Sequence, residues 1–305
     1  MKVLVTGGSG FIGSSVVDEL LKAGHEPVVV DRRVNPWTRK LPVEIHECAV
    51  QDIGPISGLD GVIHLAADHI VAESVRDPLR YYDNNLSSLV RAINLAPDMF
   101  VFSSSAAVYG KGTDFSETSP TDPINPYGKT KLWGEEILAD AGIRHVSLRY
   151  FNAAGAGECH GYMQTPRTHV VPILLDCVRK DSPFTVFGKG LDTRDGTCVR
   201  DYTHVIEIAR AHVAALEYRG TQRAINIGSG RETTLLELIA AVEVVTGKRV
   251  RWSYGSTRSY DPPRLVADVA KAQTELGWRA EMGLQEIIQD AWAWEQLVSA
   301  GQTYR

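Results

Sequence analysis

The sequence predicts an α/β protein whose main part is a doubly wound parallel sheet, with a smaller α/β part towards the C-terminus. Short apolar runs alternate with segments of helical periodicity through residues 2–152, which is typical of a parallel sheet covered by helices. A glycine-rich turn joins the first apolar run to the first helical segment. After residue 152 the alternation gives way to longer loops, so we predict domains over 1–152 and 153–305.

The first domain contains six predicted strands and three main helices. The strands are short runs rich in β-branched and other apolar residues, at 2–6, 27–31, 43–47, 61–67, 99–105 and 145–152. Apolar residues at helical spacing predict helices in the second half of 6–24, over 76–96 and over 127–141. In such a sheet, ligands bind at the carboxyl ends of the strands.

The second domain is predicted to cover that edge and complete a small-molecule pocket. We expect helices over 170–180, 204–219, 234–246, 268–276 and 284–297, and strands over 184–188, 224–228 and 249–254. The segment at about 203–228 is expected to return to the first domain. Residues 188–204 form a long polar loop, and loops of this length are usually functional.

Composition excludes several classes of protein. A net charge of −5 over 305 residues argues against nucleic-acid binding by bulk charge. No apolar run is long enough to predict a membrane span, and the N-terminal run is too short for a signal peptide. The cysteines are scattered and none has metal-ligand spacing, so we predict free thiols in a reducing cytoplasm and no metal. They are Cys48, Cys159, Cys177 and Cys198.

The glycine-rich turn predicts a dinucleotide site. Gly7, Gly10 and Gly13 lie between a strand and a helix, where backbone amides can approach a pyrophosphate. Their spacing differs from the usual G-x-G-x-x-G. Asp31 ends the second strand, 18 residues after Gly13. There it can bind an adenosine ribose, which favours NAD over NADP, or merely cap a turn. Arg32 and Arg33 follow it, and arginines there can accommodate NADP. A strand, a glycine-rich turn, a helix and a second strand in this order predict a Rossmann-type sheet.

The segment 127-YGKTK-131 brings a phenol and an ammonium group to one helix face. Residues i and i+4 are neighbours on a helix, and a nearby cation favours the phenolate of Tyr127. Such a phenol can act as a general base. By itself the motif fits a solvated helix face equally well. Ser103–Ser105 and Asn152 follow strands at the ligand-binding edge, and Tyr127 can face the same crevice.

With these residues identified, the chain resembles the extended short-chain dehydrogenase/reductase family. Within that family it is most similar to the UDP-glucose (UDP-galactose) 4-epimerases. The similarity runs nearly end to end, through TGGSGFIG, VIHLAA, FVFSSSAAVYG, NPYGKTK, LRYFNAAGA, DGTCVRDYTHV, INIGSG and ADVAKA–ELGW. Single motifs here occur throughout the family, whereas the combination of SSSAAVYG with DGTCVRDY–H is much more specific to the epimerase branch.

The resemblance implies a role for each matching residue. Tyr127 is the catalytic base and acid, Lys131 tunes it and holds the nicotinamide ribose, and Ser105 binds the sugar 4-oxygen. The implied NAD contacts are Gly7, Gly10, Phe11, Ile12, Gly13, Asp31, Arg32, Leu65, Ala66, Ala67, Asn84, Ser103, Tyr127, Lys131 and Phe151. The implied nucleotide-sugar contacts are Ser105, Tyr127, Asn152, Val170, Thr185, Phe187, Arg200, Arg258 and Asp261. Arg200 and Arg258 would bind the diphosphate, although Arg200 could instead pair with Asp201.

Three positions depart from the family pattern. His69 replaces a lysine beside the cofactor, Ala49 replaces an acid that meets adenine, and Tyr260 replaces a glycine near the nucleotide. The first two changes remove cofactor contacts. Leu265, at the position that gates bulky 2-substituents, leaves the choice of sugar open.

The implied activity is NAD-dependent epimerisation of a UDP-hexose at C4, through a 4-keto intermediate, in a cytoplasmic homodimer. A 4,6-dehydratase would carry an Asp/Glu pair where this chain has Ala106 and Ala107. A 4-keto-sugar reductase that consumes NAD(P)H remains an alternative, as does a catalytically idle NAD-binding protein. The helices near Pro78 and Tyr127 carry apolar residues that fit a dimer interface or a monomer core.

Overall fold

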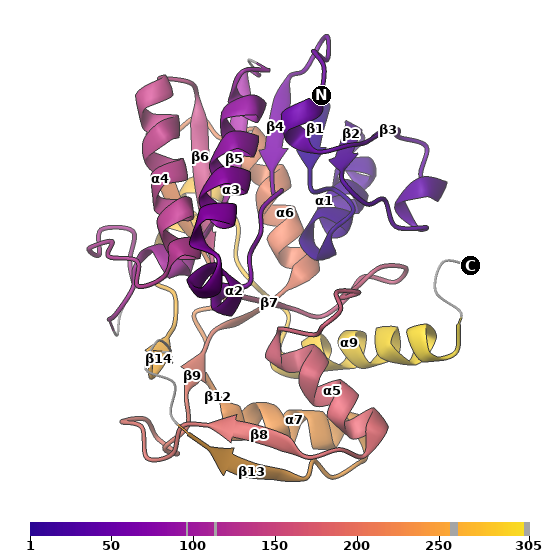
Figure 1. The fold of residues 1–305 in the computed structure, drawn as a ribbon, viewed down its shortest axis with the longest axis vertical. Helices are drawn as coiled ribbons and strands as arrows, with labels where there is room; N and C mark the ends of the chain where they lie inside the picture. The colour runs from indigo at the N-terminus through magenta and orange to yellow at the C-terminus, as the bar shows by residue number, and fades with distance from the viewer. Residues whose placement is uncertain (96, 113–114, 257–261, 302–305) are drawn as a thin grey trace.

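The computed structural model describes residues 1–95, 97–112, 115–256 and 262–301. Its main feature is a seven-stranded sheet in the order β11-β6-β5-β4-β1-β2-β3, in which every pair is parallel. The strands are β1 (Lys2–Thr6), β2 (Glu26–Asp31), β3 (Glu44–Glu47), β4 (Gly61–His64), β5 (Met99–Ser105), β6 (His145–Tyr150) and β11 (Ala224–Ile227). The predicted fold class is confirmed (Figure 1).

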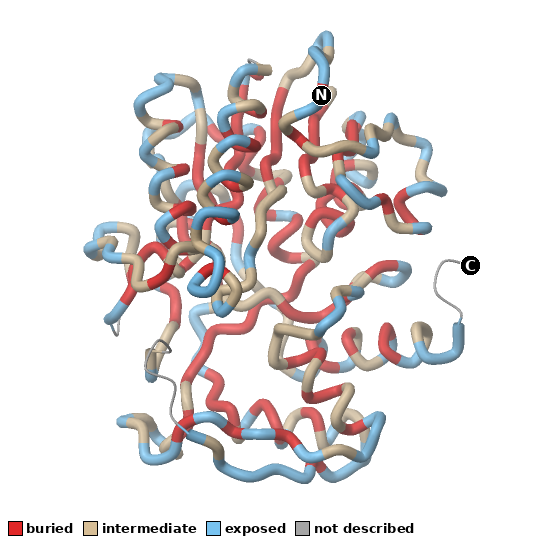
Figure 2. The backbone as a smooth tube through the Cα atoms, in the orientation of Figure 1, coloured by how far each residue is buried: buried red, intermediate tan, exposed pale blue. Residues whose placement is uncertain are grey.

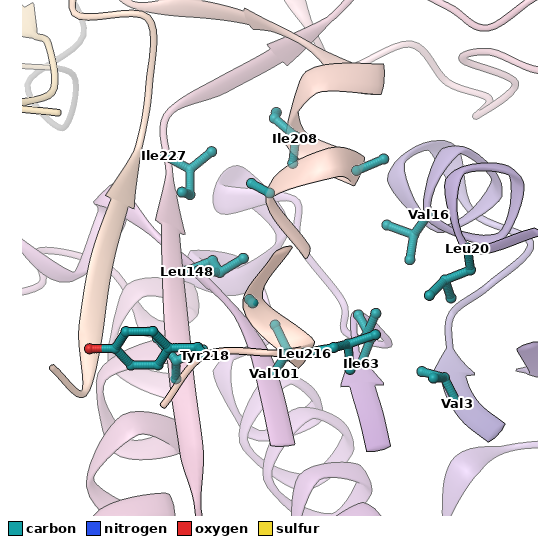
Figure 3. Packing of buried hydrophobic residues seen from close by; sticks show 14 of the residues in the cluster. Val3, Val16, Leu20, Ile63, Val101, Leu148, Ile208, Leu216, Tyr218 and Ile227 are labelled. Atoms are coloured by element: carbon teal, nitrogen blue, oxygen red, sulfur yellow. The ribbon is translucent and has the colours of Figure 1, made fainter. Parts of the chain in front are cut away.

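Helices cover both faces of this sheet. The first face packs against α1 (Phe11–Lys22), α6 (Val205–Leu216) and α8 (Ala270–Leu276), through a buried cluster that includes Val16, Leu20, Ile208 and Leu216 (Figure 3). The second face packs against α3 (Pro78–Ile93) and α4 (Pro126–Ala141). Buried residues therefore run along the strands and exposed ones along the outer faces of the helices (Figure 2).

The smaller part of the molecule lies beyond the carboxyl ends of these strands (Figure 1). Its core joins α5 (Val170–Lys180), α7 (Leu235–Thr246) and α9 (Leu284–Ser299) to β8 (Phe184–Phe187). β8 pairs with β13 (Trp252–Gly255). Two more small sheets connect the parts: β10 (Tyr202–His204) with β7 (Asn152–Ala154), and β9 (Val199–Arg200) with β12 (Thr233–Thr234) and β14 (Arg264–Leu265).

Several predicted elements differ from the structure. The segment 188–204, expected to be loop, contains β9 and β10. These strands are too short to leave a pattern, and their partners lie far away in the sequence. The run 145–152 divides at Phe151 into β6 and β7, and the run 61–67 ends as a strand at His64. A short helix, α2 (Val71–Arg76), precedes α3, and 3₁₀ turns occupy Thr38–Lys40, Val50–Asp52 and Ala106–Val108. Among the helices of the described ranges, none is long and apolar enough to cross a membrane.

Candidate active site

A cavity of about 1110 Å³ opens between the strand ends of the large sheet and the smaller part. Nearly all the predicted site residues line it. They are Gly7, Gly10, Phe11, Ile12, Gly13, Asp31, Arg32, Leu65, Ala66, Ala67, Asn84, Ser105, Tyr127, Lys131, Phe151, Asn152, Val170, Thr185, Phe187 and Arg200. Arg258, Tyr260 and Asp261 lie outside the described residues. Ser103 is the described exception, because its side chain faces elsewhere.

The glycine-rich turn forms a backbone cradle at one end of the cavity. Gly7 has a φ of +70°, and a Cβ there would lie 2.9 Å from the backbone nitrogen of Ala66. A Cβ on Gly13 would lie 2.0 Å from the carbonyl oxygen of Gly7. α1 begins after Gly10 with no side-chain cap and no acid in its first turn. Its first amides are therefore available to a bound anion, which fits a pyrophosphate.

Asp31 lies at the next strand end. One carboxylate oxygen accepts the Ser9 N–H at 3.1 Å, and the other accepts the Arg33 N–H at 3.1 Å. Asp31 thus caps the turn and also lines the cavity, so the two alternatives left open by the sequence are compatible. Each oxygen keeps a lone pair that a ribose hydroxyl can use. Arg32 pairs with Asp68 at 3.4 Å on the exposed rim.

Tyr127 and Lys131 are positioned by the start of α4. The Asn125 side chain accepts the Gly128 N–H at 2.8 Å, which caps the helix directly before Pro126. A Cβ on Gly128 would lie 2.5 Å from the Ala107 carbonyl oxygen. The absence of a side chain on Gly128 therefore lets α4 approach the turn that follows Ser105. This approach permits the hydrogen bond between the side chains of Tyr127 and Ser105.

The Lys131 ammonium group is deeply buried behind the phenol. Its Nζ donates to the Ser103 carbonyl at 2.7 Å and lies 5.8 Å from the centre of the Tyr127 ring. Burial lowers the pKa of Lys131 to about 7, although Glu135 opposes this shift. Burial raises the pKa of Tyr127 to about 12, and the bond with Ser105 opposes that rise. The expected lowering of the Tyr127 pKa by Lys131 is not found, because burial disfavours both charges.

The Ser103 side chain lies behind the cavity wall. Its Oγ lies 3.0 Å from Nε2 of His212, a ring whose Nδ1 lies 2.8 Å from the Ile208 carbonyl oxygen. A carbonyl can only accept, so Nδ1 carries the proton and Ser103 donates to Nε2. The Ser103 side chain therefore points towards His212 and does not line the cavity, and its contact with the cofactor stays a prediction. The Ser103 carbonyl oxygen accepts a hydrogen bond from the Lys131 Nζ. Ser103 therefore helps to position Lys131.

Arg200 lines the far side of the cavity, and its side chain is buried there. The Asp201 carboxylate accepts from the Ser229 N–H at 2.8 Å, the Ser229 hydroxyl at 2.6 Å and the Gly230 N–H at 2.9 Å. Asp201 therefore fastens two loops together.

Several cavity residues were not singled out as site residues. His69, which departs from the family pattern, has its Nε2 3.0 Å from Oε1 of Gln164. The His69 and His169 rings lie 5.7 Å apart. Burial lowers the pKa of both rings, that of His169 to about 4. His69 is therefore neutral near pH 7 and does not supply the charge of a lysine. Only folding brings positions 69, 164 and 169 together, so no spacing could have predicted this group.

The fold and the cavity together define a nucleotide-binding enzyme of the extended short-chain dehydrogenase/reductase type. The sequence model of the NAD dependent epimerase/dehydratase family matches residues 3–228. The chain belongs to this family, which confirms the predicted membership.

Individual relatives of this chain narrow the class of enzyme further. The UDP-glucose 4-epimerase of Lactobacillus helveticus is 40% identical over 97% of this chain and 97% of its own. The crystal structure of UDP-glucose-4-epimerase from Stenotrophomonas maltophila, with bound NAD and formylated UDP-arabinopyranose, has a TM-score of 0.92 at 34% identity and covers 99% of both chains. The enzyme from Bifidobacterium longum, in complex with NAD+ and UDP, has a TM-score of 0.90 at 32% identity and covers 99% of this chain and 100% of its own. The prediction of an NAD-dependent epimerase is confirmed.

Proposed function

We propose that this protein interconverts UDP-glucose and UDP-galactose by transient oxidation at C4 of the hexose. One observation carries the proposal. Ser105, Tyr127 and Lys131 lie on one wall of a cavity that also contains the glycine cradle and Arg200. We expect a dinucleotide on the glycine cradle and a nucleotide-sugar on Arg200 to meet with their reacting ends beside Ser105, Tyr127 and Lys131.

The described residues fit NAD. The α1 amides would hold its pyrophosphate, Asp31 would bind the adenosine ribose, and Lys131 would hold the nicotinamide ribose. When bound, NAD takes a hydride from C4 of the sugar and returns it. The protein supplies position and proton transfer.

Tyr127 is the proposed proton carrier. Its phenolate oxygen would take the proton from the sugar 4-hydroxyl group and later return it to the 4-oxygen, while the hydride returns to the opposite face of C4. The bond with Ser105 orients the phenol and gives the 4-oxygen a second partner. The pKa of Tyr127 is about 12. Loss of the phenol's own proton near neutral pH therefore requires a further positive charge nearby.

The substrate is proposed to be held firmly at its nucleotide and loosely at its sugar. Arg200 would bind the diphosphate, a task suited to a guanidinium group, and Arg258 and Asp261 would assist it. Thr185 and Phe187 would lie along the uracil, and Val170 and Asn152 would also contact the nucleotide-sugar. Loose contact with the hexose lets the 4-keto intermediate turn over before reduction.

Ala106 and Ala107 oppose elimination. Both line the cavity directly after Ser105, and neither can protonate a leaving 6-hydroxyl group. Among the described residues, no group of three or more His, Cys, Asp or Glu side chains could hold a metal ion.

The test is to incubate the purified protein with UDP-galactose and follow UDP-glucose by chromatography and NADH by absorbance. We expect interconversion without net NADH change. Tyr127→Phe should slow it by roughly 10²–10⁴-fold, the usual contribution of a general base, while NAD stays bound. Stoichiometric consumption of NAD(P)H with a 4-keto-sugar would instead identify a reductase, and bound NAD without turnover would identify an idle binding protein.

We further propose that residues 1–152 with 203–228 form the dinucleotide-binding domain, and that the remainder of 153–305 binds the nucleotide-sugar. The position of β11 beside β6 supports this division. No disulfide joins the four cysteines, all of which are described, which fits a cytoplasmic location.

A homodimer is proposed to form through α3 and α4. Leu79 and Val90 on α3 are 75% and 44% exposed, and Trp133 on α4 is 38% exposed. The Tyr82 and Trp133 rings lie 5.1 Å apart and connect the two helices. An apolar stripe across two packed helices is typical of an interface between copies.

A further inference from the structure

Gln51 lies at the adenosine end of the cavity, in the turn that follows β3. The turn after β1 forms the backbone cradle, and Asp31 ends β2, the strand between β1 and β3. The base of a dinucleotide held in this order lies beyond Asp31, where Cys48, Val50 and Gln51 line the wall. Ala49, which precedes this turn, has no side-chain acceptor for an exocyclic amine.

The orientation of the Gln51 amide follows from a chain of hydrogen bonds that begins at backbone atoms. The Asn85 Oδ1 accepts the Asp68 N–H at 2.8 Å, and the Asn85 Nδ2 donates to the Asp68 carbonyl at 3.0 Å. Backbone groups have fixed roles, so the orientation of Asn85 is determined. The Asn84 Nδ2 then donates to the Asn85 Oδ1 at 3.2 Å, which turns the Asn84 Oδ1 towards Gln51.

Gln51 completes the chain. Its Nε2 donates to the backbone oxygen of Asn84 at 3.3 Å and to the Asn84 Oδ1 at 3.4 Å. A flip of the Gln51 amide would place oxygen against two oxygens. Among the residues that the structure describes, none donates to the Gln51 Oε1. Gln51 therefore presents an acceptor, and no donor, to the cavity.

We infer that Gln51 reads the exocyclic amine of adenine and replaces the acid that is absent at Ala49. The inference rests on the proposed NAD-dependent function and names a specificity residue within it. An amine on the base donates to the Gln51 Oε1. A carbonyl at the same ring position, as in hypoxanthine, would face it with a second acceptor. The fixed amide then rejects the hypoxanthine base, because flipping it would break both bonds to Asn84.

The chain of bonds also explains why the amide is held firmly. The Asn85 Nδ2 also lies 3.1 Å from the Thr130 Oγ1, and Thr130 donates to the Tyr127 carbonyl at 2.7 Å. Gln51 is thus connected through two asparagines to the helix that carries Tyr127.

The experiment is a competition for the full-length protein. The protein is equilibrated with equal concentrations of NAD and its hypoxanthine analogue until the bound ratio is constant. Free dinucleotide is then removed by gel filtration. The retained dinucleotide is released by denaturation and identified by chromatography. The bound ratio compares two ligands in one sample, so partial misfolding of a variant does not change it.

We expect the wild-type protein to retain NAD over the analogue by roughly tenfold, the effect of one hydrogen bond replaced by a repulsive contact. Gln51→Leu should bring the ratio close to one, because it removes the acceptor. Adding Ala49→Asp to Gln51→Leu should restore the preference, and Gln285→Leu on the exposed face of α9 is the matched control.

An unchanged ratio in Gln51→Leu, with NAD still bound and epimerase activity present, would overturn the role of Gln51 alone. A wild-type ratio near one would do the same. Failure of the wild-type protein to retain either dinucleotide would overturn the proposed function and this inference together.

Discussion

Lys131 illustrates how burial sets chemistry at the scale of one residue. An ammonium group that is 5% exposed and donates to a carbonyl is easier to neutralise than a solvated one. Burial also favours the neutral form of its i, i+4 neighbour Tyr127. The sequence predicts that the two side chains lie together. Their protonation states follow from surroundings that include Phe102 and Glu135.

This burial predicts a pH-dependent stability. The pKa of Lys131 is about 7 in the folded protein and near 10.4 in an unfolded chain. Between these values the unfolded state holds one proton more, so stability rises with pH. We expect Lys131→Met to lack this gain. The melting temperature of the wild-type protein should rise relative to that of the variant by on the order of 5 °C between pH 7 and pH 9.5.

The measurement is a series of thermal melts of protein freed of dinucleotide. It stays below pH 10 because the raised pKa of Tyr127 begins to lower stability above that value. Lys129→Met, on the exposed side of the same helix, is the control. Parallel pH curves for wild type and Lys131→Met would contradict a buried, shifted lysine.

Asp31 predicts the choice between NAD and NADP. It is the only acid among the described residues at the end of β2, and Arg32 and Arg33 follow it. Asp31→Ala should weaken NAD binding about tenfold, because a hydrogen bond to a charged group is lost, and should strengthen NADP binding. Dissociation constants from calorimetry check this, with Asp98→Ala as the control. A variant that still rejects NADP would show that Asp31 does not exclude the 2′-phosphate.

At the scale of elements, α4 and β6 are joined by a buried ion pair. The Arg149 Nε donates to the Glu135 Oε1 at 2.9 Å, and the two side chains are 7% and 11% exposed. Arg149 also lies over the Tyr109 ring at 4.9 Å. This pair fixes the helix that carries Tyr127 to the strand that leads into Phe151.

Removal of one partner leaves a buried charge unpaired. We expect Glu135→Ala to lower the free energy of unfolding by about 3–5 kcal/mol. Glu73→Ala, which breaks an exposed pair with Arg80, should cost less than about 1 kcal/mol. Urea unfolding of both variants checks the difference. Equal losses would mean that the buried pair is solvated in solution, and Glu135→Leu with Arg149→Met should recover much of the loss.

Elements also differ in how far the sequence predicts them. The long periodic helices α3, α4 and α9, and the apolar strands β1, β2 and β5, lie close to their predicted positions. β9 and β10 were missed because two or three residues carry no periodicity. They exist because Val199 and Tyr202 meet partner strands distant in the sequence. Short elements of this kind depend on tertiary pairing, which overrides local preference.

At the scale of the whole molecule, the apolar stripe on α3 and α4 predicts assembly. Leu79→Glu combined with Trp133→Glu should convert a dimer into a monomer, because two charges would be buried at the proposed interface. Gel filtration with light scattering measures the mass. Val244→Glu on α7, at a site 69% exposed, should leave the mass unchanged. A wild-type monomer, or a dimer that survives both glutamates, would contradict the proposed interface.

The sequence by itself determined the doubly wound sheet and most of the cavity wall, because both depend on local signals. Apolar periodicity sets the strands and helices. The glycine turn, Asp31 and the Tyr127–Lys131 spacing set what lies at the strand ends. Tertiary structure decided what depends on environment and on distant contacts. These are the lowered pKa of Lys131, the direction of the Ser103 side chain towards His212, the bonds of Asp201 to Ser229 and Gly230, and the fixed amide of Gln51. Burial and hydrogen-bond geometry arise only when distant segments meet, so no local pattern records them.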